Sequence, residues 1–295
     1  MDLVDLDAAK TFMASHARLL DRHRLLVVLG EGDVANTLTA VEGYRNSDGG
    51  YGWGLEPDLR SVVSQPVGAM HAMEVFAEAV PITTPRAVEL CDWLHRQTLD
   101  DGGLPFALPV EDPGGSSPIW TSGDPSSSSL QMTSQVAAHA HRLASHHPGI
   151  DEHPWLDAAT RYCLDAIGEM DDAPPAHALM FSVRFLDAAA PRVPEVDAAL
   201  DRLARHVPAD GAVPVQGGVA GEKLNLLDLS PRPGSPSRRL FDEQVIEADL
   251  ARLARLQQPD GGWTVDFETS SPAAALEWRG YATVAAVAIP LAHRA

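Results

Sequence analysis

The sequence is poor in cysteine and in long apolar runs. Its 295 residues include two cysteines, Cys91 and Cys163, far apart and outside any CxxC pair. This excludes a disulfide framework or a zinc finger and suits a reducing compartment. No run of about 20 apolar residues could span a bilayer, and residues 1–10 lack the basic-then-apolar pattern of a signal peptide. We therefore expect a cytoplasmic globular protein without a transmembrane segment.

Basic residues are also scarce. There are 22 lysines and arginines against 41 acidic residues, which gives a formal net charge of −19. This balance argues against a nucleic-acid partner and against attraction to an anionic membrane surface. Hydrophobic residues make up 45% of the chain, enough for a substantial core. We expect a single domain over residues 1–295.

Motifs that hold metals or cofactors are missing as well. The sequence contains no HExxH, no Gly-x-Ser-x-Gly elbow, no phosphate-binding Walker loop and no dinucleotide fingerprint. Its twelve histidines show no ligand spacing, and His139 and His141, two residues apart, point to different sides of a helix. We expect neither a metal nor a cofactor.

What the sequence does have is a recurring Asp-Gly turn, in SDGGYGWGLEPD, DDGGLPFALPVED, ADGAVPVQGG and PDGGWTVDFE. The turn aspartates are Asp48, Asp101, Asp210 and Asp260. Their intervals are 53, 109 and 50 residues, so the doubled middle interval predicts a degenerate copy at residues 168–177. A period near 53 residues indicates a repeated supersecondary unit.

The segments on either side of these turns differ in polarity. Those before the turns carry one apolar stripe, whereas residues 65–80, 176–190 and 272–292 are apolar nearly all round, and 130–144 is intermediate. Helices without a polar face are buried on two sides. The alternation predicts an all-α fold, an α/α toroid of about five to six helical hairpins with inner and outer helix rings. An open helical solenoid is the alternative.

The last turn, LQQPDGGWTVDF, resembles the QW repeat of squalene-cyclase-like proteins, in which a glutamine at a helix end is followed by Gly-x-Trp. HRQTLDDGGLPF is a weaker copy with Leu104 in the aromatic position, and YRNSDGGYGWGL is a third, with Asn46 in place of glutamine. The resemblance points to the terpenoid cyclase and protein prenyltransferase superfamily of α/α toroids. It implies an isoprenoid or another hydrophobic small molecule as the ligand of a central cavity.

The sequence departs from that superfamily in its catalytic motifs. Class II terpene cyclases protonate an alkene with an Asp-x-Asp-Asp motif, and the nearest match here, DLDA at residues 5–8, lacks the final aspartate. Protein prenyltransferases hold zinc with an Asp-x-Cys pair, but Glu89 precedes Cys91 and Arg161 precedes Cys163. The resemblance therefore supports the architecture and leaves the chemistry open.

Residues 51–66 are the first candidate site. Trp53, Glu56, Asp58 and Arg60 cluster there, between a turn and an apolar helix. Two carboxylates that face one cavity would create a general acid, and the aromatic and basic residues would bind substrate. The alternative is structural: Asp58 caps a turn and Glu56 pairs with Arg60.

The final apolar helix carries the second candidate site. Glu277, Trp278 and Arg279 interrupt it, and a buried charge is costly unless it is paired or faces a polar cavity. Glu277 and Arg279 form a structural ion pair or line the lumen. Asp266 and Glu268, which follow the last turn, are further candidate acids.

Two loops are candidate lids. The loop at 113–128 precedes a predicted helix. Trp120 in the loop and Gln131 at the start of the helix are candidate substrate-binding residues. The loop at 227–241 holds three arginines that could bind an anionic group such as a diphosphate, although a solvated linker explains them equally.

Three classes of function fit these features. The first is an enzyme acting on an isoprenoid or hydrophobic molecule, in which a carboxylic acid supplies a proton and Trp53, Trp120, Trp263 and Trp278 stabilise cationic intermediates. The second is a carbohydrate-active enzyme (a glycosidase, lyase or epimerase), which needs two carboxylates across a polar cleft. The third is a non-catalytic toroid that only binds its ligand.

Overall fold

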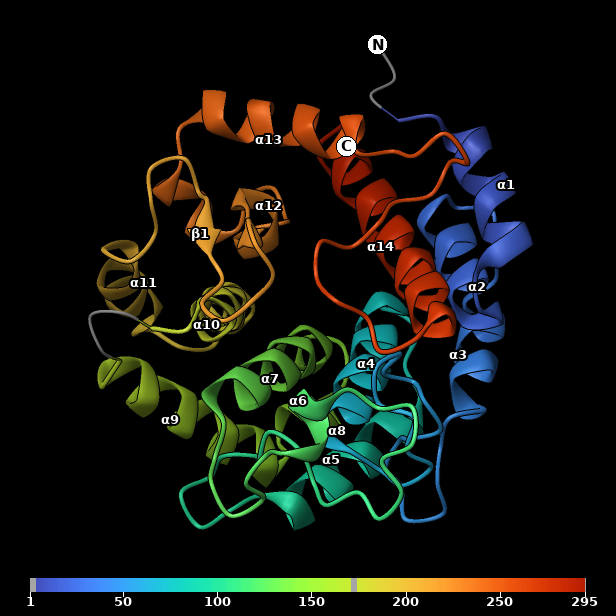
Figure 1. The fold of residues 1–295 in the computed structure, drawn as a ribbon. Coiled ribbons are helices and arrows are strands. Elements are labelled where there is room, and N and C mark those ends of the chain that lie inside the picture. The colour runs from blue at the N-terminus through green and yellow to red at the C-terminus, as the bar shows by residue number, and fades with distance from the viewer. Residues whose placement is uncertain (1–3, 171–173, 295) are drawn as a thin grey trace. The chain divides into compact units, whose positions relative to one another are not determined.

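The computed structural model describes residues 4–170 and 174–294, and they are mostly helical (Figure 1). The prediction of an all-α protein is confirmed. The strands of the described part are confined to one short antiparallel pair, β1 (Val213–Pro214) and β2 (Lys223–Leu224). None of the helices in these ranges combines the length and the apolarity that a bilayer crossing requires.

Contacts divide the chain, which we expected to form one domain, into two compact units. Unit 1 is Met1–Val41 together with Pro208–Ala295, and unit 2 is Glu42–Val207. Both ends of the chain therefore belong to unit 1, and helix α3 (Val34–Glu42) leads from unit 1 into unit 2.

Unit 2 is built around three buried helices, α4 (Pro66–Glu78), α7 (Leu130–Ala144) and α10 (Ala176–Ala189). Helix α7 packs between the other two, as Figure 1 shows. Eleven of the thirteen residues of α4 are buried, which explains why the sequence is apolar on every side there. A helix covered on all sides cannot keep a polar stripe.

The remaining helices of unit 2 are less buried. The longer ones are α5 (Pro85–Gln97), α9 (Pro154–Gly168) and α11 (Val196–Ala204), and each of them buries one face. The four-residue ones are α6 (Pro118–Thr121) and α8 (Pro148–Asp151), and α6 has no buried residue. Local sequence sets their starts: Thr84 caps α5, with Pro85 in its first turn. Ser129 caps α7, because its side chain accepts a hydrogen bond from the amide of Met132.

Unit 1 contains the first and last helices of the chain. They are α1 (Leu6–His16), α2 (Leu19–Val28), α12 (Leu226–Leu229), α13 (Glu243–Arg255) and α14 (Pro272–Ala292), with a 3-10 helix at Pro236–Leu240. Helix α14 lies against α2 and also contacts α1 (Figure 1). Phe12, Met13, Leu25, Trp263 and Val287 belong to the core between them.

Three of the Asp-Gly turns share one geometry. In each, the aspartate side chain accepts a hydrogen bond from the amide of the second glycine, and the first glycine adopts a positive φ. The aspartate–glycine pairs are Asp48–Gly50 (3.0 Å), Asp101–Gly103 (3.0 Å) and Asp260–Gly262 (3.2 Å). The φ angles of Gly49, Gly102 and Gly261 are 92°, 90° and 93°. A residue with a Cβ adopts such angles only at a cost.

Each of these turns packs against an aromatic ring of another helix in the same unit. A Cβ on the second glycine would lie 2.6–2.8 Å from ring carbons, so only glycine fits. The pairs are Gly50 with Trp93 of α5, Gly103 with Tyr162 of α9, and Gly262 with Phe12 of α1. The turn after α3 thus packs on α5, the turn after α5 on α9, and the turn after α13 on α1.

The copy at Asp210 is irregular. Asp210 accepts from the amide of Ala212 at 3.1 Å, but the chain then enters β1 and the four-residue α12 instead of a long helix. A capping box of Asn225 and Asp228 starts that short helix. The degenerate copy at 168–177 lies partly outside the described residues, between the end of α9 and the start of α10.

Candidate functional site

Glycines fold residues 51–65 tightly over the start of α4. A Cβ on Gly52 would overlap the carbonyl oxygen of Val63, and one on Gly68 would overlap that of Tyr51. The amide of Gln65 donates to the same Tyr51 carbonyl at 2.9 Å. The loop therefore lies in direct backbone contact with the first turn of the helix.

This fold brings Glu56 to His71, a residue of α4. The two side chains are buried, and Glu56 Oε2 lies 2.9 Å from His71 Nε2. The other oxygen, Oε1, accepts a hydrogen bond from the amide of Asp58 at 3.0 Å. Glu74 Oε2 lies 3.9 Å from His71 Nδ1, so the imidazole sits between two carboxylates.

These carboxylates decide the charge of the imidazole. Burial by itself lowers the pKa of His71, but the hydrogen bond to Glu56 and the negative charges of Glu56 and Glu74 outweigh it, and the pKa is raised above the ordinary value. When the ring is protonated, it donates from Nε2 to Glu56. The pair can therefore hold a proton between a carboxylate and an imidazole, inside the protein.

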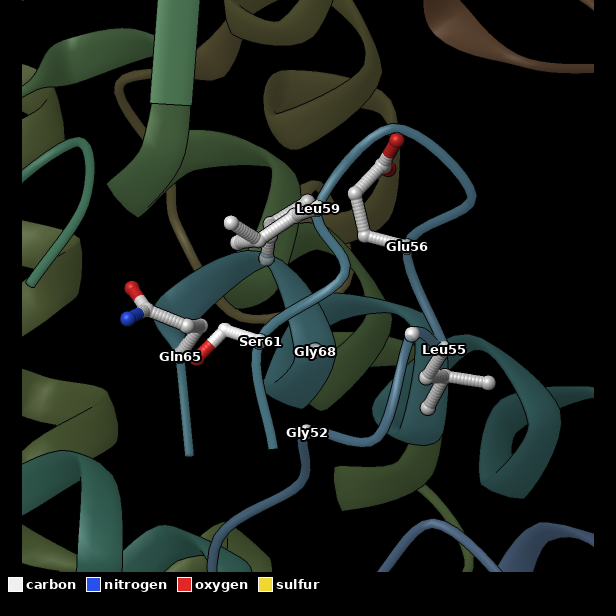
Figure 2. Close-up of a pocket in the computed structure, with 9 residues that line it drawn as sticks. Gly52, Leu55, Glu56, Leu59, Ser61, Gln65 and Gly68 are labelled. Atoms are coloured by element: carbon white, nitrogen blue, oxygen red, sulfur yellow. The ribbon is translucent and has the colours of Figure 1, made fainter. Parts of the chain in front are cut away.

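A small hollow, open to solvent, lies beside Glu56 (Figure 2). Glu56 and Leu59 stand on the two arms of one arch of the loop, and Gln65 stands at the start of the helix. The residues that line the hollow are Gly52, Gly54, Leu55, Glu56, Leu59, Ser61, Gln65, Val67 and Gly68. Glu56 is the charged group of this lining, and a small molecule in the hollow would meet it beside apolar side chains.

Asp58 and Arg60 tie the same loop to the predicted lid at 113–128. The carbonyl of buried Asp58 accepts from the amide of Ser117 at 2.8 Å, and the amide of Arg60 donates to Ser116 Oγ at 2.9 Å. The structure thus brings these two residues to the site through their backbones. The start of that loop is held against the arch that carries Glu56.

Trp120 and Gln131 are not among the residues that line the hollow. The ring of Trp120 is stacked on Phe106, with centroids 4.7 Å apart and an interplanar angle of 5°. Gln131 lies in the first turn of α7 and is partly exposed. The geometry gives neither side chain a place beside Glu56.

The second predicted cluster lies in unit 1, around the last turn. Arg279 binds Asp260 through two contacts of 2.7 and 2.9 Å, and its guanidinium lies 4.4 Å from the ring centroid of Phe12. The hydrogen bond from Arg279 lowers the pKa of Asp260 below its ordinary value. Arg279 thus pairs with the turn aspartate and braces the turn against α1.

The other residues of that cluster also belong to unit 1 and are not among those that line the hollow. Asp266 and Glu268 are exposed, and Glu277 is partly buried in the first half of α14. Trp278 makes edge contacts with Phe267 and Tyr281, with centroids 5.1 and 5.4 Å apart. This aromatic row belongs to unit 1, whereas the hollow belongs to unit 2.

Within residues 4–170 and 174–294, no group of three or more metal-ligating side chains is placed to hold an ion.

The chain matches no protein-family model and no curated protein. Any assignment of function therefore depends on the arrangement around Glu56.

Our sequence analysis missed His71 and Glu74. The signal was present, because these polar residues interrupt an otherwise apolar helix three positions apart, and that spacing puts them on one face. A buried histidine with a carboxylate one turn away is a candidate proton-transfer group. Its partner Glu56, fifteen residues upstream, could not be found from helical periodicity.

The contrast between His71 and His141 is testable by pH titration. We expect His71 to titrate above pH 6.5, so its contribution to stability is complete below that pH and is lost as the pH rises through its raised pKa. Burial, with a smaller effect of Arg192, lowers the pKa of His141 to about 3. His141 therefore stays neutral in the fold and destabilises it as the pH falls below about 6.5.

Histidine ring resonances recorded by NMR between pH 4 and 9 follow both residues in one sample: His71 should titrate above pH 6.5, and His141 should stay neutral down to pH 4. His71→Gln and His141→Gln variants assign the signals. A His71 resonance that titrates below pH 6 would contradict the cationic pair.

Proposed function

We propose that this chain is an α/α toroid that binds an isoprenoid or another hydrophobic small molecule and transfers a proton to it from Glu56. The observation that carries the proposal is the buried Glu56–His71 pair, at 2.9 Å, on the wall of the hollow. A titratable pair of this kind in a concave site is the usual mark of acid–base catalysis.

The two residues have different tasks. Glu56 lines the hollow, so its carboxyl group is the one that meets the ligand. His71 stands behind it on α4, fixes its orientation and, when protonated, holds the proton. In each cycle that proton passes from Nε2 to the Glu56 carboxylate and on to the ligand, and the proton that the product cation loses returns to the pair. A positioned acid of this kind accelerates proton transfer by roughly 10²–10⁴-fold.

Two features support the ring architecture. The same turn geometry recurs in both units, with an aspartate, a glycine of positive φ and a second glycine packed on an aromatic ring. In unit 1 the turn after α13 packs on α1, and α14 lies against α2, so the last hairpin contacts the first. A toroid requires contact between its last and first hairpins, so this contact favours the toroid over the open solenoid.

The ligand class follows from the resemblance of these turns to the QW repeat and from the apolar share of the lining, Leu55, Leu59 and Val67. Protonation of an alkene by Glu56, followed by loss of a proton from the product cation, leaves the formula of the substrate unchanged. The reaction would be an isomerisation or a cyclisation.

Deuterium incorporation from solvent tests this reaction. With farnesol as the substrate in D₂O, we expect an isomer that carries one solvent deuteron, detected by mass spectrometry. Glu56→Gln should lower its rate of formation at least about 100-fold, because an amide cannot donate the proton at this position.

Glu169→Gln is the matched control for this experiment, since Glu169 is an exposed glutamate of unit 2 beyond the end of α9. It should leave the rate unchanged. Farnesol that raises the melting temperature without any exchange would indicate the non-catalytic toroid. The absence of both effects would overturn the proposal.

A carbohydrate-active enzyme is the second candidate. The specific observation in its favour is that Glu56 and Glu74 flank the two nitrogens of His71, so two carboxylates occupy one site. Glycosidases use two carboxylates on either side of the scissile bond; of these two, Glu56 lines the hollow. Hydrolysis of an aryl glycoside that is lost in both Glu56→Gln and Glu74→Gln would favour this candidate over the first.

A further inference from the structure

Trp53 adopts a backbone conformation that bulky residues avoid. Its φ angle is 55°, the left-handed region, and it is the one non-glycine residue of the described ranges with a positive φ. Glycines stand on both sides of it, and Gly54 also has a positive φ of 70°. For a side chain of this size such a conformation is a genuine outlier, and it persists only where the surroundings or the function require it.

Packing does not explain this conformation. The indole is 57% exposed, and its neighbours across the loop, Val62 and Val63, are exposed at 52% and 44%. A side chain that leaves most of its surface in water gains little free energy from burial. The strain therefore serves something other than the core.

The orientation of the indole is nevertheless defined. Its Nε1–H donates to Asn46 Oδ1 at 2.8 Å, and the amide nitrogen of Asn46 in turn donates to the Val62 carbonyl and to Ser64 Oγ. These bonds fix the amide and, through it, the polar edge of the ring. The exposed faces of the ring remain available for contact.

The internal repeat shows what this position can do. Trp53 follows the second glycine of its turn by three residues, and Phe106 holds the same place in the next turn. The ring of Phe106 is covered by a parallel stack with Trp120. Two of the three regular turns thus place an aromatic ring at this position, and the third has Val265 there. In one of the two aromatic copies another part of the chain covers the ring.

We propose that the face of Trp53 is a stacking platform for the ligand of the neighbouring hollow. Gly52 and Gly54, the residues on either side of it, both line that hollow together with Glu56. A π face attracts flat, C–H-rich or cationic groups. Both an isoprenoid chain and the flat side of a sugar ring offer such a face. The platform rests on the proposed function in one respect, because both require a ligand in this hollow.

Calorimetric titration of the full chain with farnesol and, separately, with cellobiose tests the platform and identifies the source of the stacking face. Trp53→Leu, which removes the ring but keeps an apolar side chain, should weaken binding of one of the two about tenfold. Trp53→Phe keeps a face and should stay within about threefold of the unmodified protein. Ile82→Ala, at an exposed apolar residue of unit 2, is the control and should bind as the unmodified protein does.

Trp53→Gly separates the platform from a structural role. Glycine adopts a φ of 55° without strain, so we expect a melting temperature within about 3 °C of the unmodified protein together with weakened binding. A large fall in melting temperature with unchanged binding would overturn the platform, because Trp53 would then serve the fold.

Binding of neither probe, or equal binding to Trp53→Leu, would also overturn the platform. These outcomes are distinguishable from failure of the proposed function. If Glu56→Gln abolishes deuterium exchange while Trp53→Leu binds normally, the proton-transfer site stands and the platform does not. If Trp53→Leu weakens binding and no exchange occurs, the platform stands and the proton transfer does not.

Discussion

Replacing Glu56 with alanine should lower the free energy of unfolding by about 3 kcal/mol at pH 6, as measured by urea denaturation. Removing one partner of a buried ion pair leaves the other charge uncompensated, which costs roughly 3–5 kcal/mol. The lower end of that range applies, because His71 can lose its proton and Glu74 remains 3.9 Å from its Nδ1. The buried amide of Asp58 also loses its acceptor.

The double variant Glu56→Ala/His71→Ala isolates the interaction. If the two side chains are coupled, the double variant loses less free energy of unfolding than the two single variants lose together. We expect the difference between these losses, which is the coupling energy, to exceed about 1 kcal/mol. Glu169→Ala, an exposed glutamate in the same unit, should change stability by less than about 0.5 kcal/mol. A loss below 1 kcal/mol for Glu56→Ala would mean that the carboxylate is not held as the geometry indicates.

The loss should shrink as the pH rises above the raised pKa of His71, because a neutral imidazole leaves no uncompensated charge. Repeating the denaturation at pH 9 therefore distinguishes the ion pair from simple loss of packing. An effect that is equal at both pH values would favour packing.

The second large effect is expected at Gly261, the first glycine of the last turn. Its φ is 93°, and a Cβ there would overlap the carbonyl oxygen of Ala8 in α1. A left-handed residue with a Cβ costs about 1–2 kcal/mol, and crowding in a packed region adds about 1–3 kcal/mol. Gly261→Ala should therefore destabilise the protein by about 4 kcal/mol in urea denaturation.

Gly30 supplies the matched control in the same unit. Its φ is also positive, at 69°, but nothing lies within 4 Å of a Cβ placed there. Gly30→Ala should cost only the conformational part, about 1–2 kcal/mol. Equal losses for the two variants would show that the turn after α13 is not held tightly against α1.

Much of the candidate site was predictable from the sequence, because the signals were local. Trp53, Glu56, Asp58 and Arg60 stand between an Asp-Gly turn and an apolar helix, and loops that precede buried helices are where binding residues gather. The site beside α4 was therefore located from the residues alone. The contacts that each of these residues makes could not be predicted from the sequence.

Arg279 shows the limit of such reasoning. An arginine in an apolar helix must be paired or face a polar cavity, and the sequence suggested Glu277 or the lumen. The structure pairs it with Asp260, nineteen residues earlier. Sequence spacing identifies neighbours on one helix, but it does not identify the partner that a turn brings against it.

The sequence by itself determined the helices and the turns of this protein. Apolar periodicity, prolines at helix starts and the Asp-Gly turns act over a few residues, so they can be read without knowledge of the fold. The tertiary structure alone decided that Glu56 meets His71. That contact depends on the loop lying against α4 where Gly52 and Gly68 permit backbone contact, and close approach between distant segments leaves no periodic signal in the chain.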